Sequence, residues 1–564
     1  MSKIKIGLLI DDLNVSEINS DLINWIIKQK ELNIELLVIN NIKKNKISRF
    51  VSIVKKYSLL RILEKTIFKM IFNFEKFIYS FFLKQYKFKK IKLDELKINK
   101  ILTTPNISKN HLYYNYTDKT VTAIKSYNLD LIIRMGSGII KGDILTSAKY
   151  GILSFHHADN EINRGGPAGF WEVYHRQPES GFIIQQLTEV LDGGIVLKKG
   201  FFPTKIFYFY NQIFLYKKSN YYFKDLILYI IKNDSLPEST ASKPYNGKIY
   251  KDPNLIEIFR YLTRTYSYIL KKFFNRLLKE KNTWYVAYQS NDFKNMNLTK
   301  FNYIKNRPNS FNADPFLFKF KDSNYLFVEN YNFKNKKGCI SVYLLENENY
   351  EFLGDVLIEK FHLSFPYIFS FENKIYMCPE TNELDEIRIY ECINFPLKWR
   401  YKMTLIKGVS AADTMIFEHN KIWWLLTNID YSNIGDHSSE FSIFYSLEGP
   451  LTSDWKAHKF NPLIVDSKKA RNAGIIFDND KIYRISQKYG FDVYGKEINI
   501  NIIKNLDTNL YQEKNIKNIK SNFFKDIIAT HHMNSNADYV VVDCCKKNYF
   551  NKDDGLNKIN DQIN

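Results

Sequence analysis

The segment Gly151–Leu197 reads GILSFHHADNEINRGGPAGFWEVYHRQPESGFIIQQLTEVLDGGIVL, and its pattern sets the fold prediction for the first half of the chain. Ile152–Phe155 is a short apolar run after a glycine, which predicts a buried strand. Because side chains alternate along a strand, Ser154 and His156 are expected on the same side. The segment therefore places a polar pair at the end of a buried strand.

Two further strands are predicted at Phe182–Leu187 and Ile195–Leu197, joined by the glycine turn Leu191–Gly194. The turn carries Asp192, so a sheet would bring a histidine and a carboxylate together. This pair suits acyl transfer to an amine, in which a histidine takes the proton and a carboxylate orients the imidazole.

On these residues the segment resembles the N-terminal domain of the folate-dependent formyltransferases. That family carries an Asn-x-His motif, an Arg-Gly turn and a Leu-Asp-x-Gly loop; here His156, Arg164-Gly165 and Leu191-Asp192-Gly193-Gly194 stand at those places, with Ser154 in place of the asparagine. The resemblance implies an α/β Rossmann-like fold and 10-formyltetrahydrofolate as co-substrate. It implies His156 as base and oxyanion partner, Asp192 as orienting carboxylate and Ser154 as an auxiliary donor.

The rest of the first half predicts a doubly wound sheet, with strands at Lys3–Ile10 and Leu129–Met135. No G-x-G-x-x-G motif follows the first strand, so a dinucleotide is not expected. A helix is predicted over Ile139–Ala148. The formyltransferase resemblance implies folate contacts along the carboxyl edge of this sheet, at Gly136, Ser137, Leu191, Gly193 and Gly194.

Two amphipathic regions accompany this domain, which we place at residues 1–236. Residues 47–92 are aromatic, aliphatic and basic, and predict one or two inserted helices that either pack on their own domain or contact a membrane surface. Residues 237–282 predict a linker followed by a connecting helix over Asp252–Lys281.

Beyond Trp284 the pattern changes to short strands separated by Asn, Asp and Gly, and one motif recurs about every 50 residues. Five copies predict a five-bladed β-propeller over residues 283–548, with Trp284–Ala287 as a closing strand, and a frayed tail over 549–564. The copies begin at Ala313-Asp314-Pro315, Phe365-Pro366, Ala412-Asp413-Thr414, Ala473-Gly474 and, in degenerate form, His531-His532.

The start of each inner strand is expected to face the propeller axis, which gathers carboxylates at one mouth: Asp314, Glu329, Glu380 and Asp413. This half resembles the propellers of furanosidase-type glycoside hydrolases and, more closely, the N-terminal propeller of plant glucosamine inositolphosphorylceramide transferases. Three roles stay open: glycoside hydrolysis by paired carboxylates, binding of a glycan or sugar nucleotide, and scaffolding.

The composition sets limits on the function. The chain has 564 residues with 45% hydrophobic and 16% aromatic content, which is typical of several globular domains. The net charge of +21 comes from dispersed lysines, so nucleic acid is not expected. The five cysteines show no zinc spacing, so no metal is expected. The N-terminus has no signal-peptide pattern, which predicts a cytoplasmic protein.

Taken together, the sequence predicts a folate-dependent N-formyltransferase that acts on an amino sugar, nucleotide-linked or within a glycan. The alternatives are a non-catalytic carbohydrate-binding or accessory protein of glycan assembly, a glycosidase-type propeller, and formylation of methionyl-tRNA. The last lacks support because the small C-terminal barrel of that class is not seen in the sequence. Peripheral membrane contact and the oligomeric state stay open.

Overall fold

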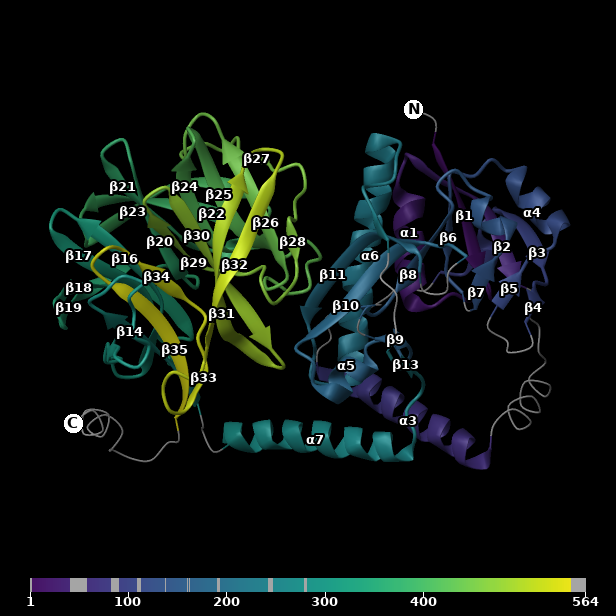
Figure 1. Cartoon of the computed structure of the whole chain (residues 1–564), viewed down its shortest axis with the longest axis horizontal. Helices are drawn as coiled ribbons and strands as arrows, with labels where there is room; N and C mark the ends of the chain where they lie inside the picture. Colours follow the sequence, from purple (N-terminus) through teal and green to yellow (C-terminus); the bar gives the residue numbers. More distant parts are fainter. Residues whose placement is uncertain are drawn as a thin grey trace. The chain divides into compact units, whose positions relative to one another are not determined.

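The structure is a computed structural model that describes residues 3–40, 58–82, 91–108, 113–136, 138–159, 161, 163–189, 193–241, 247–277 and 281–548. The chain divides into two compact units, Met1–Thr265 and Tyr266–Asn564 (Figure 1). No helix among the described residues is long and apolar enough to cross a membrane.

The first unit is built on one eight-stranded mixed sheet. Five neighbouring strands run parallel, and the remaining three continue the sheet antiparallel from β8. In sheet order the strands are β12 (Thr240–Ala241), β11 (Ile195–Pro203), β10 (Glu179–Gln186), β8 (Ile152–His156), β6 (Leu131–Arg134), β1 (Ile4–Ile10), β2 (Leu32–Asn40) and β3 (Asn99–Thr103).

Helices and two small sheets complete this unit. The helices are α1 (Glu17–Lys28), α3 (Leu59–Phe82), α4 (Asp118–Lys125), α5 (Phe170–His175), α6 (Tyr208–Asn233) and α7 (Leu255–Leu277), the last of which continues into the second unit. One small sheet pairs β9 (Arg164–Gly165) with β13 (Ile249–Tyr250), and the other joins β4 (Asn106–Ile107), β5 (Tyr113–Asn115) and β7 (Ile139–Lys141). The predicted helix over Ile139–Ala148 is wrong: that stretch holds β7 and a single 3-10 turn, Asp143–Thr146.

Local packing explains these elements. Ser16 caps α1 by accepting a hydrogen bond from the backbone N–H of Asn19, and α6 ends where Asp234 takes the left-handed conformation. The predicted inserted helix is α3, and its Glu75 is 1% exposed because it accepts hydrogen bonds from the Phe209 backbone N–H and the Tyr261 hydroxyl.

The predicted fold class, a Rossmann-like formyltransferase domain followed by a propeller, is wrong for the chain as a whole. The chain is mostly β, with 46% of residues in strands and 22% in helices, divided among many small sheets. The large sheet of the first unit is parallel over β8, β6, β1, β2 and β3 and becomes antiparallel at β10, β11 and β12.

The second unit consists of five antiparallel sheets in which strands that follow one another in sequence are paired (Figure 1). The first four are β16 (Ser310–Phe320), β17 (Ser323–Asn332), β18 (Lys337–Glu346), β19 (Asn349–Leu357); β20 (Ser364–Phe371), β21 (Lys374–Glu380), β22 (Glu386–Asn394), β23 (Lys398–Lys407); β24 (Ala411–His419), β25 (Ile422–Ile429), β26 (Glu440–Ser446), β27 (Lys456–Ala457) with β28 (Ile464–Val465); and β29 (Asn472–Asp478), β30 (Lys481–Gly490), β31 (Val493–Leu506), β32 (Tyr511–Lys520).

The fifth sheet closes the unit because it contains both the first and the last strands of the second unit. It contains β14 (Lys281–Gln289), β15 (Asn302–Tyr303), β33 (Ile527–Ala529), β34 (Met533–Ser535) and β35 (Val540–Asn548). The predicted closing strand is confirmed, because β14 pairs with β35 from Lys281–Asn548 to Gln289–Val540. Pairing the first strand with the last closes the ring of sheets, and such radial repetition leaves only short, protected edges.

Apolar cores join neighbouring sheets around a ring. Val286 and Leu326 share one core between the fifth and first sheets, and Phe327 and Met377 share the next between the first and second. A larger core around Trp424 joins the second, third and fourth sheets, and another joins the fourth to the fifth. The five sequence repeats therefore correspond to five sheets packed in a closed ring.

Candidate functional site

The inner strands β16, β20, β24 and β29 share one irregularity in strand pairing near their first residues. The pairing of β16, β20, β24 and β29 with the next strand skips two residues near its start, and one skipped residue in each has a left-handed backbone. These left-handed residues are Asp314, Phe365, Asp413 and Gly474. Aspartate and glycine tolerate this conformation better than most residues, so the repeated motif has a backbone reason.

The bulges turn backbone N–H groups toward carboxylates of neighbouring sheets. The N–H of Phe365 donates to Asp314 Oδ2 at 3.2 Å, and the N–H of Asp314 donates to Asp543 Oδ2 at 3.3 Å. In the same way the N–H of Asp413 donates to Glu380 Oε2 at 3.3 Å. These carboxylates therefore hold strand ends together, in addition to any role toward a ligand.

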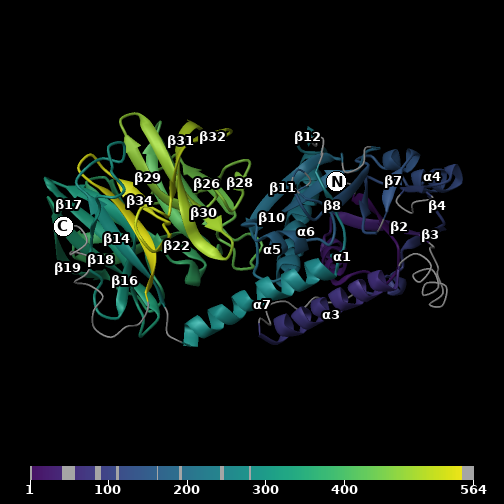
Figure 2. The same ribbon diagram turned by 60° about the horizontal axis from the view of Figure 1, so that its bottom comes forward.

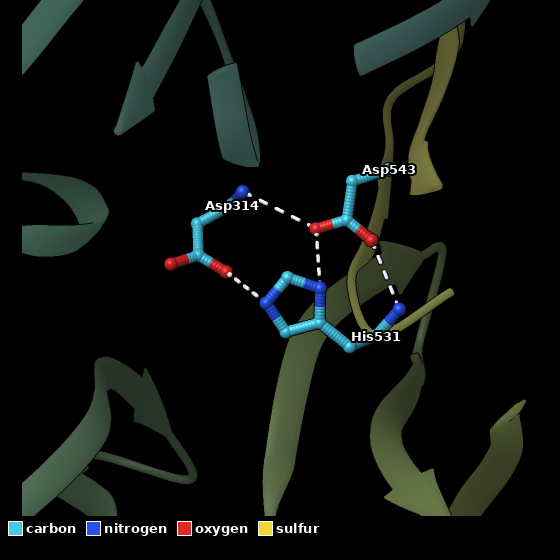
Figure 3. A group of neighbouring side chains, drawn as sticks. All are labelled: Asp314, His531 and Asp543. Atoms are coloured by element: carbon cyan, nitrogen blue, oxygen red, sulfur yellow. Dashed lines mark hydrogen bonds and ion pairs between the residues drawn. The ribbon is translucent and has the colours of Figure 1, made fainter. Parts of the chain in front are cut away.

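His531 lies between two aspartates from different sheets (Figure 3). Its Nε2 is 3.2 Å from Asp314 Oδ1, and its Nδ1 is 2.7 Å from Asp543 Oδ2 in a contact that is close but not aligned as a hydrogen bond. Asp543 Oδ1 also accepts the backbone N–H groups of His531 and His532, each at 2.9 Å. The arrangement favours an imidazolium held by two buried carboxylates.

The pKa values of the carboxyl groups at this site are shifted in opposite directions. Burial opposes ionisation of Asp314, but the hydrogen bond and charge of His531 hold its pKa at about 2. Burial and the charge of Asp314 raise the pKa of Glu329 well above its usual value, and burial and the charge of Asp413 do the same for Glu380. The site thus favours the ionised form of Asp314 and the neutral forms of Glu329 and Glu380.

Arg471 provides the second cation. Its Nε donates to Asp413 Oδ2 at 2.6 Å, and its guanidinium lies 3.7 Å from Glu380 Oε2. Its carbon centre is 5.0 Å from the Tyr494 ring centroid, a cation–π distance. The Arg471 side chain is 14% exposed, so it is within reach of solvent at the site.

Half-buried rings complete the site. The Trp284 and Tyr494 rings lie 4.0 and 5.1 Å from the His531 ring, measured between centroids. His362 lies beside Glu329, with 3.5 Å between Nε2 and Oε1. We refer to the set Trp284, Asp314, Glu329, Glu380, Asp413, Arg471, Tyr494, His531 and Asp543 as the carboxylate mouth.

Sequence reasoning found part of this set. The structure brings Asp314 and Asp413 into linked clusters with Glu329 and Glu380, because the charges of these four groups act on one another. His531, Asp543, Arg471 and Tyr494 were missed as site residues. A signal existed for two of them: the His531-His532 pair stands where the other copies carry Ala-Asp, Phe-Pro or Ala-Gly, and Asp543 interrupts the apolar run Val540–Cys545.

Asp314, His531 and Asp543 are also a group that could hold a metal ion, since one ligand atom from each lies within 4.8 Å of the others. However, both ring nitrogens of His531 already lie against carboxylate oxygens, and the two carboxylates raise its pKa to about 10 although burial opposes the charge. A proton on each nitrogen satisfies this geometry, whereas a ligating nitrogen must be deprotonated. The absence of a metal stays a prediction.

A separate pocket lies at the other ends of β20 and β24. Phe371, Glu372, Glu418, Trp423 and Phe477 are among its lining residues. The carboxyls with opposed pKa shifts are at the starts of these strands instead, so we treat the carboxylate mouth as the candidate site.

In the first unit, the described part of the predicted formyl-transfer site is incomplete. Ser154 and His156 lie half-buried on β8, where the Ser154 hydroxyl donates to its neighbour's carbonyl, Phe155 O, at 3.3 Å. Gly136 packs against Asp11 and Arg134, and Gly193 and Gly194 precede β11. Ser137, Leu191 and Asp192 lie outside the described residues, so the predicted meeting of His156 and Asp192 stays a prediction.

Comparison with known proteins places the similarity in the second unit. A family model described as glucosamine inositolphosphorylceramide transferase 1, N-terminal, matches residues 278–537. The proteins named glucosamine inositolphosphorylceramide transferase 1 from Arabidopsis thaliana and Oryza sativa subsp. japonica are 36% and 35% identical over 212 residues. Each match covers 36% of this chain but only 27% and 28% of the relatives, so the chain spans about a quarter of their length.

Two solved structures illustrate the range of structural likeness. Zg3597, a family 117 glycoside hydrolase from Zobellia galactanivorans, matches 49% of this chain and 96% of its own with 10% identity and a TM-score of 0.32. A glycinamide ribonucleotide transformylase from Symbiobacterium toebii matches 42% of this chain and 91% of its own with 12% identity and a TM-score of 0.29. Neither likeness is close enough to bear on fold or function.

These findings correct the predicted activity. The relatives are named as transferases of glucosamine inositolphosphorylceramide, so the prediction of a folate-dependent N-formyltransferase is wrong, as are 10-formyltetrahydrofolate as co-substrate and the amino-sugar formylation it implied. The predicted resemblance of the second half is confirmed: residues 278–537 are homologous to the N-terminal part of the glucosamine inositolphosphorylceramide transferases.

Proposed function

We propose that this protein serves glycan assembly by binding a sugar at the carboxylate mouth. The observation that carries the proposal is the meeting of buried carboxyls and Arg471 with the half-exposed rings of Trp284 and Tyr494 at the start of the inner strands. Sugar sites need a few fixed donors and acceptors for hydroxyl groups and an apolar surface for the ring. The carboxylate mouth offers both.

The charges favour a neutral or amino sugar over a phosphate. Glu329 and Glu380 have raised pKa values that favour their neutral forms, which leaves Asp314, Asp413 and Asp543 against two cations, Arg471 and His531. A small negative excess repels phosphate and attracts an ammonium group. Glucosamine, which appears in the relatives' name, carries such a group, and this supports an amino sugar as ligand.

The test is saccharide binding by the full chain, measured by calorimetry or saturation-transfer NMR with glucosamine, N-acetylglucosamine and inositol phosphate. We expect glucosamine to bind most tightly and Trp284→Ala to weaken binding at least about tenfold, because the ring would supply apolar contact area. Trp423→Ala, in the separate pocket at the opposite strand ends, is the matched control and should leave binding unchanged. Equal binding by Trp284→Ala and wild type, or no binding of any sugar, rejects the proposal.

A second candidate is chemistry at a glycosidic bond. The specific feature in its favour is that burial and neighbouring charges raise the pKa values of Glu329 and Glu380 while His531 holds the pKa of Asp314 at about 2, since such chemistry needs one carboxylic acid and one carboxylate. Release of sugar from chromogenic glycosides by the wild type, lost in Glu380→Gln and in Glu329→Gln, would support it. Sugar binding without release would leave only the binding role.

A further inference from the structure

Helix α3 and the beginning of α7 carry apolar side chains that are exposed on the surface of the first unit. They are Leu59, Leu60, Leu63, Met70, Phe74, Phe77 and Phe81 in α3, and Ile256 and Phe259 in α7. We call this set the apolar face.

The spacing of these residues places most of those in α3 in one stripe. In α3 most of them recur at intervals of three, four and seven residues, so at about 100° per residue they share one side of the helix over a length of about 33 Å. The opposite side of α3 holds buried Glu64, Ile71, Glu75 and Tyr79. The stripe is therefore not the core-facing side of the helix.

The two helices are fixed side by side at the beginning of α7 (Figure 2). Glu64 of α3 accepts the N–H of Leu255, the first residue of α7, and Glu75 accepts the Tyr261 hydroxyl. Arg61 donates to the carbonyl oxygens of Asp252 and Pro253 just before α7. This polar seam holds the helices together without using the apolar residues on the outside.

The exposed charges of both helices are almost all positive. The acidic residues of α3 and α7 are Glu64, Glu75 and Glu257, and each is buried or half-buried in a hydrogen bond. In the first unit the exposed basic residues of these helices are Lys69, Lys76, Arg260 and Arg264, of which Lys76 also pairs with Glu17 and the two arginines also donate hydrogen bonds to Tyr174. An apolar stripe rich in Phe and Leu beside basic side chains is typical of helices that lie in the interface of an anionic membrane.

We propose that α3 and α7 dock the protein on an anionic lipid surface, with the apolar face inserted at the level of the headgroups and the basic residues against lipid phosphates. The charge complementarity distinguishes this occupant from a second copy of the chain, whose corresponding face would be equally basic. The proposal does not depend on the sugar-binding role of the carboxylate mouth.

The test is co-sedimentation of the full chain with vesicles of phosphatidylcholine alone and of phosphatidylcholine mixed with phosphatidylglycerol. We expect binding to the anionic vesicles and much weaker binding to the neutral ones, with a decrease at high salt. Leu63→Ser with Phe77→Ser should lower the partition coefficient at least about tenfold, and Ile256→Ser with Phe259→Ser should act likewise, because each removes two inserting side chains.

Matched controls separate lipid binding from folding. Ile358→Ser with Leu447→Ser replaces side chains that are 69% and 65% exposed elsewhere in the second unit, and binding should stay at the wild-type level. Lys69→Glu with Lys76→Glu should weaken binding to anionic vesicles only. Thermal unfolding should be unchanged in all four double variants, since the replaced side chains are exposed.

Two outcomes would overturn the proposal. One is wild-type protein that stays in solution with both kinds of vesicle. The other is sedimentation velocity showing a dimer that the Ser variants convert to monomer, together with unchanged vesicle binding; a second copy would then cover the apolar face.

Discussion

His531 should remain a doubly protonated imidazolium well above neutral pH, and its deprotonation should destabilise the second unit. Burial disfavours the charged ring, but the Asp543 charge and the Asp314 hydrogen bond raise its pKa from 6.5 to about 10. Since the folded-state pKa lies above that of the unfolded chain, the stabilisation is complete below pH 6.5 and is lost as the pH rises through about 10. At 1.36 kcal/mol for each pKa unit, this difference corresponds to about 5 kcal/mol.

The protonation state can be observed directly. In the full chain with 15N-labelled histidine, one of the ten imidazoles should keep the imidazolium signature at about pH 9, and the signal should be missing in His531→Gln. The neighbouring His532 should behave in the opposite way, because burial lowers its pKa below the usual value. It should stay neutral where solvent-exposed histidines are charged.

The contribution of His531 to stability is measured as a difference between the wild type and His531→Gln. The free energy of unfolding in urea, measured from about pH 6 to about pH 10, should fall more steeply for the wild type than for His531→Gln. Lys217 of the first unit also titrates in this range, since burial lowers its pKa to about 8, but it is present in both proteins and cancels. Ten histidines that all titrate near pH 6.5, or two parallel stability curves, would refute the reasoning.

Three further predictions concern stability. Gly474→Ala should cost at least about 3 kcal/mol, because its Cβ would lie 2.1 Å from a backbone oxygen at a φ of +119°, whereas Gly408→Ala, with a φ of +73° and open space, should cost only about 1–2 kcal/mol by thermal unfolding. Arg484→Met should lower the free energy of unfolding in urea by about 3–5 kcal/mol, because Glu513 would lose its charged partner. Arg484→Met with Glu513→Leu should recover much of that stability. Asp314→Asn should lower the pKa of His531, measured on the same labelled imidazole, and cost about 2–4 kcal/mol, since it removes a charged partner.

The five-sheet unit could be predicted because its signal is local and repeated. Each copy pairs an inner strand with the strand that follows it, so alternation and turn residues within one copy determine a hairpin. The same repetition identified Asp314 and Asp413. The cations of the site could not be found in this way: Arg471 precedes β29 in an irregular segment, and His531 belongs to the most degenerate copy. Arg471 and His531 each pair with an aspartate of a neighbouring sheet, and such contacts do not change the periodicity of either strand.

The activity prediction for the first half failed for a different reason. It rested on His156 and Asp192 with a few flanking residues, and a short motif does not specify chemistry unless its structural context supports it. The inserted helix and the strands β10 and β11 could be predicted locally, but the position at which α3 packs depends on contacts between distant segments, such as Glu75 with Tyr261, that no local pattern reveals.

Comparison of equivalent positions shows which carboxyl the fold does not need. Glu380 pairs with Ser364 at the end of its strand and accepts the N–H of Asp413; Asn428 stands at the matching position one sheet later and accepts the N–H of Asn472 at 2.8 Å. An amide therefore makes the same connection between sheets without an ionisable group.

Glu380→Gln should accordingly be tolerated by the fold. Because the folded-state pKa of Glu380 is raised, its carboxyl stabilises the protein fully only below its unfolded pKa of 4.5 and loses that contribution as the pH rises, whereas glutamine is neutral at every pH. We expect a change in unfolding free energy within about 1 kcal/mol at neutral pH, and Arg471 keeps Asp413 as its partner at 2.6 Å. Glucosamine binding should nevertheless fall, because a carboxyl that can ionise beside a bound ammonium group is replaced by an amide that stays neutral. A Glu380→Gln protein that binds the sugar normally but unfolds about 3 kcal/mol more easily would assign this side chain to the fold instead.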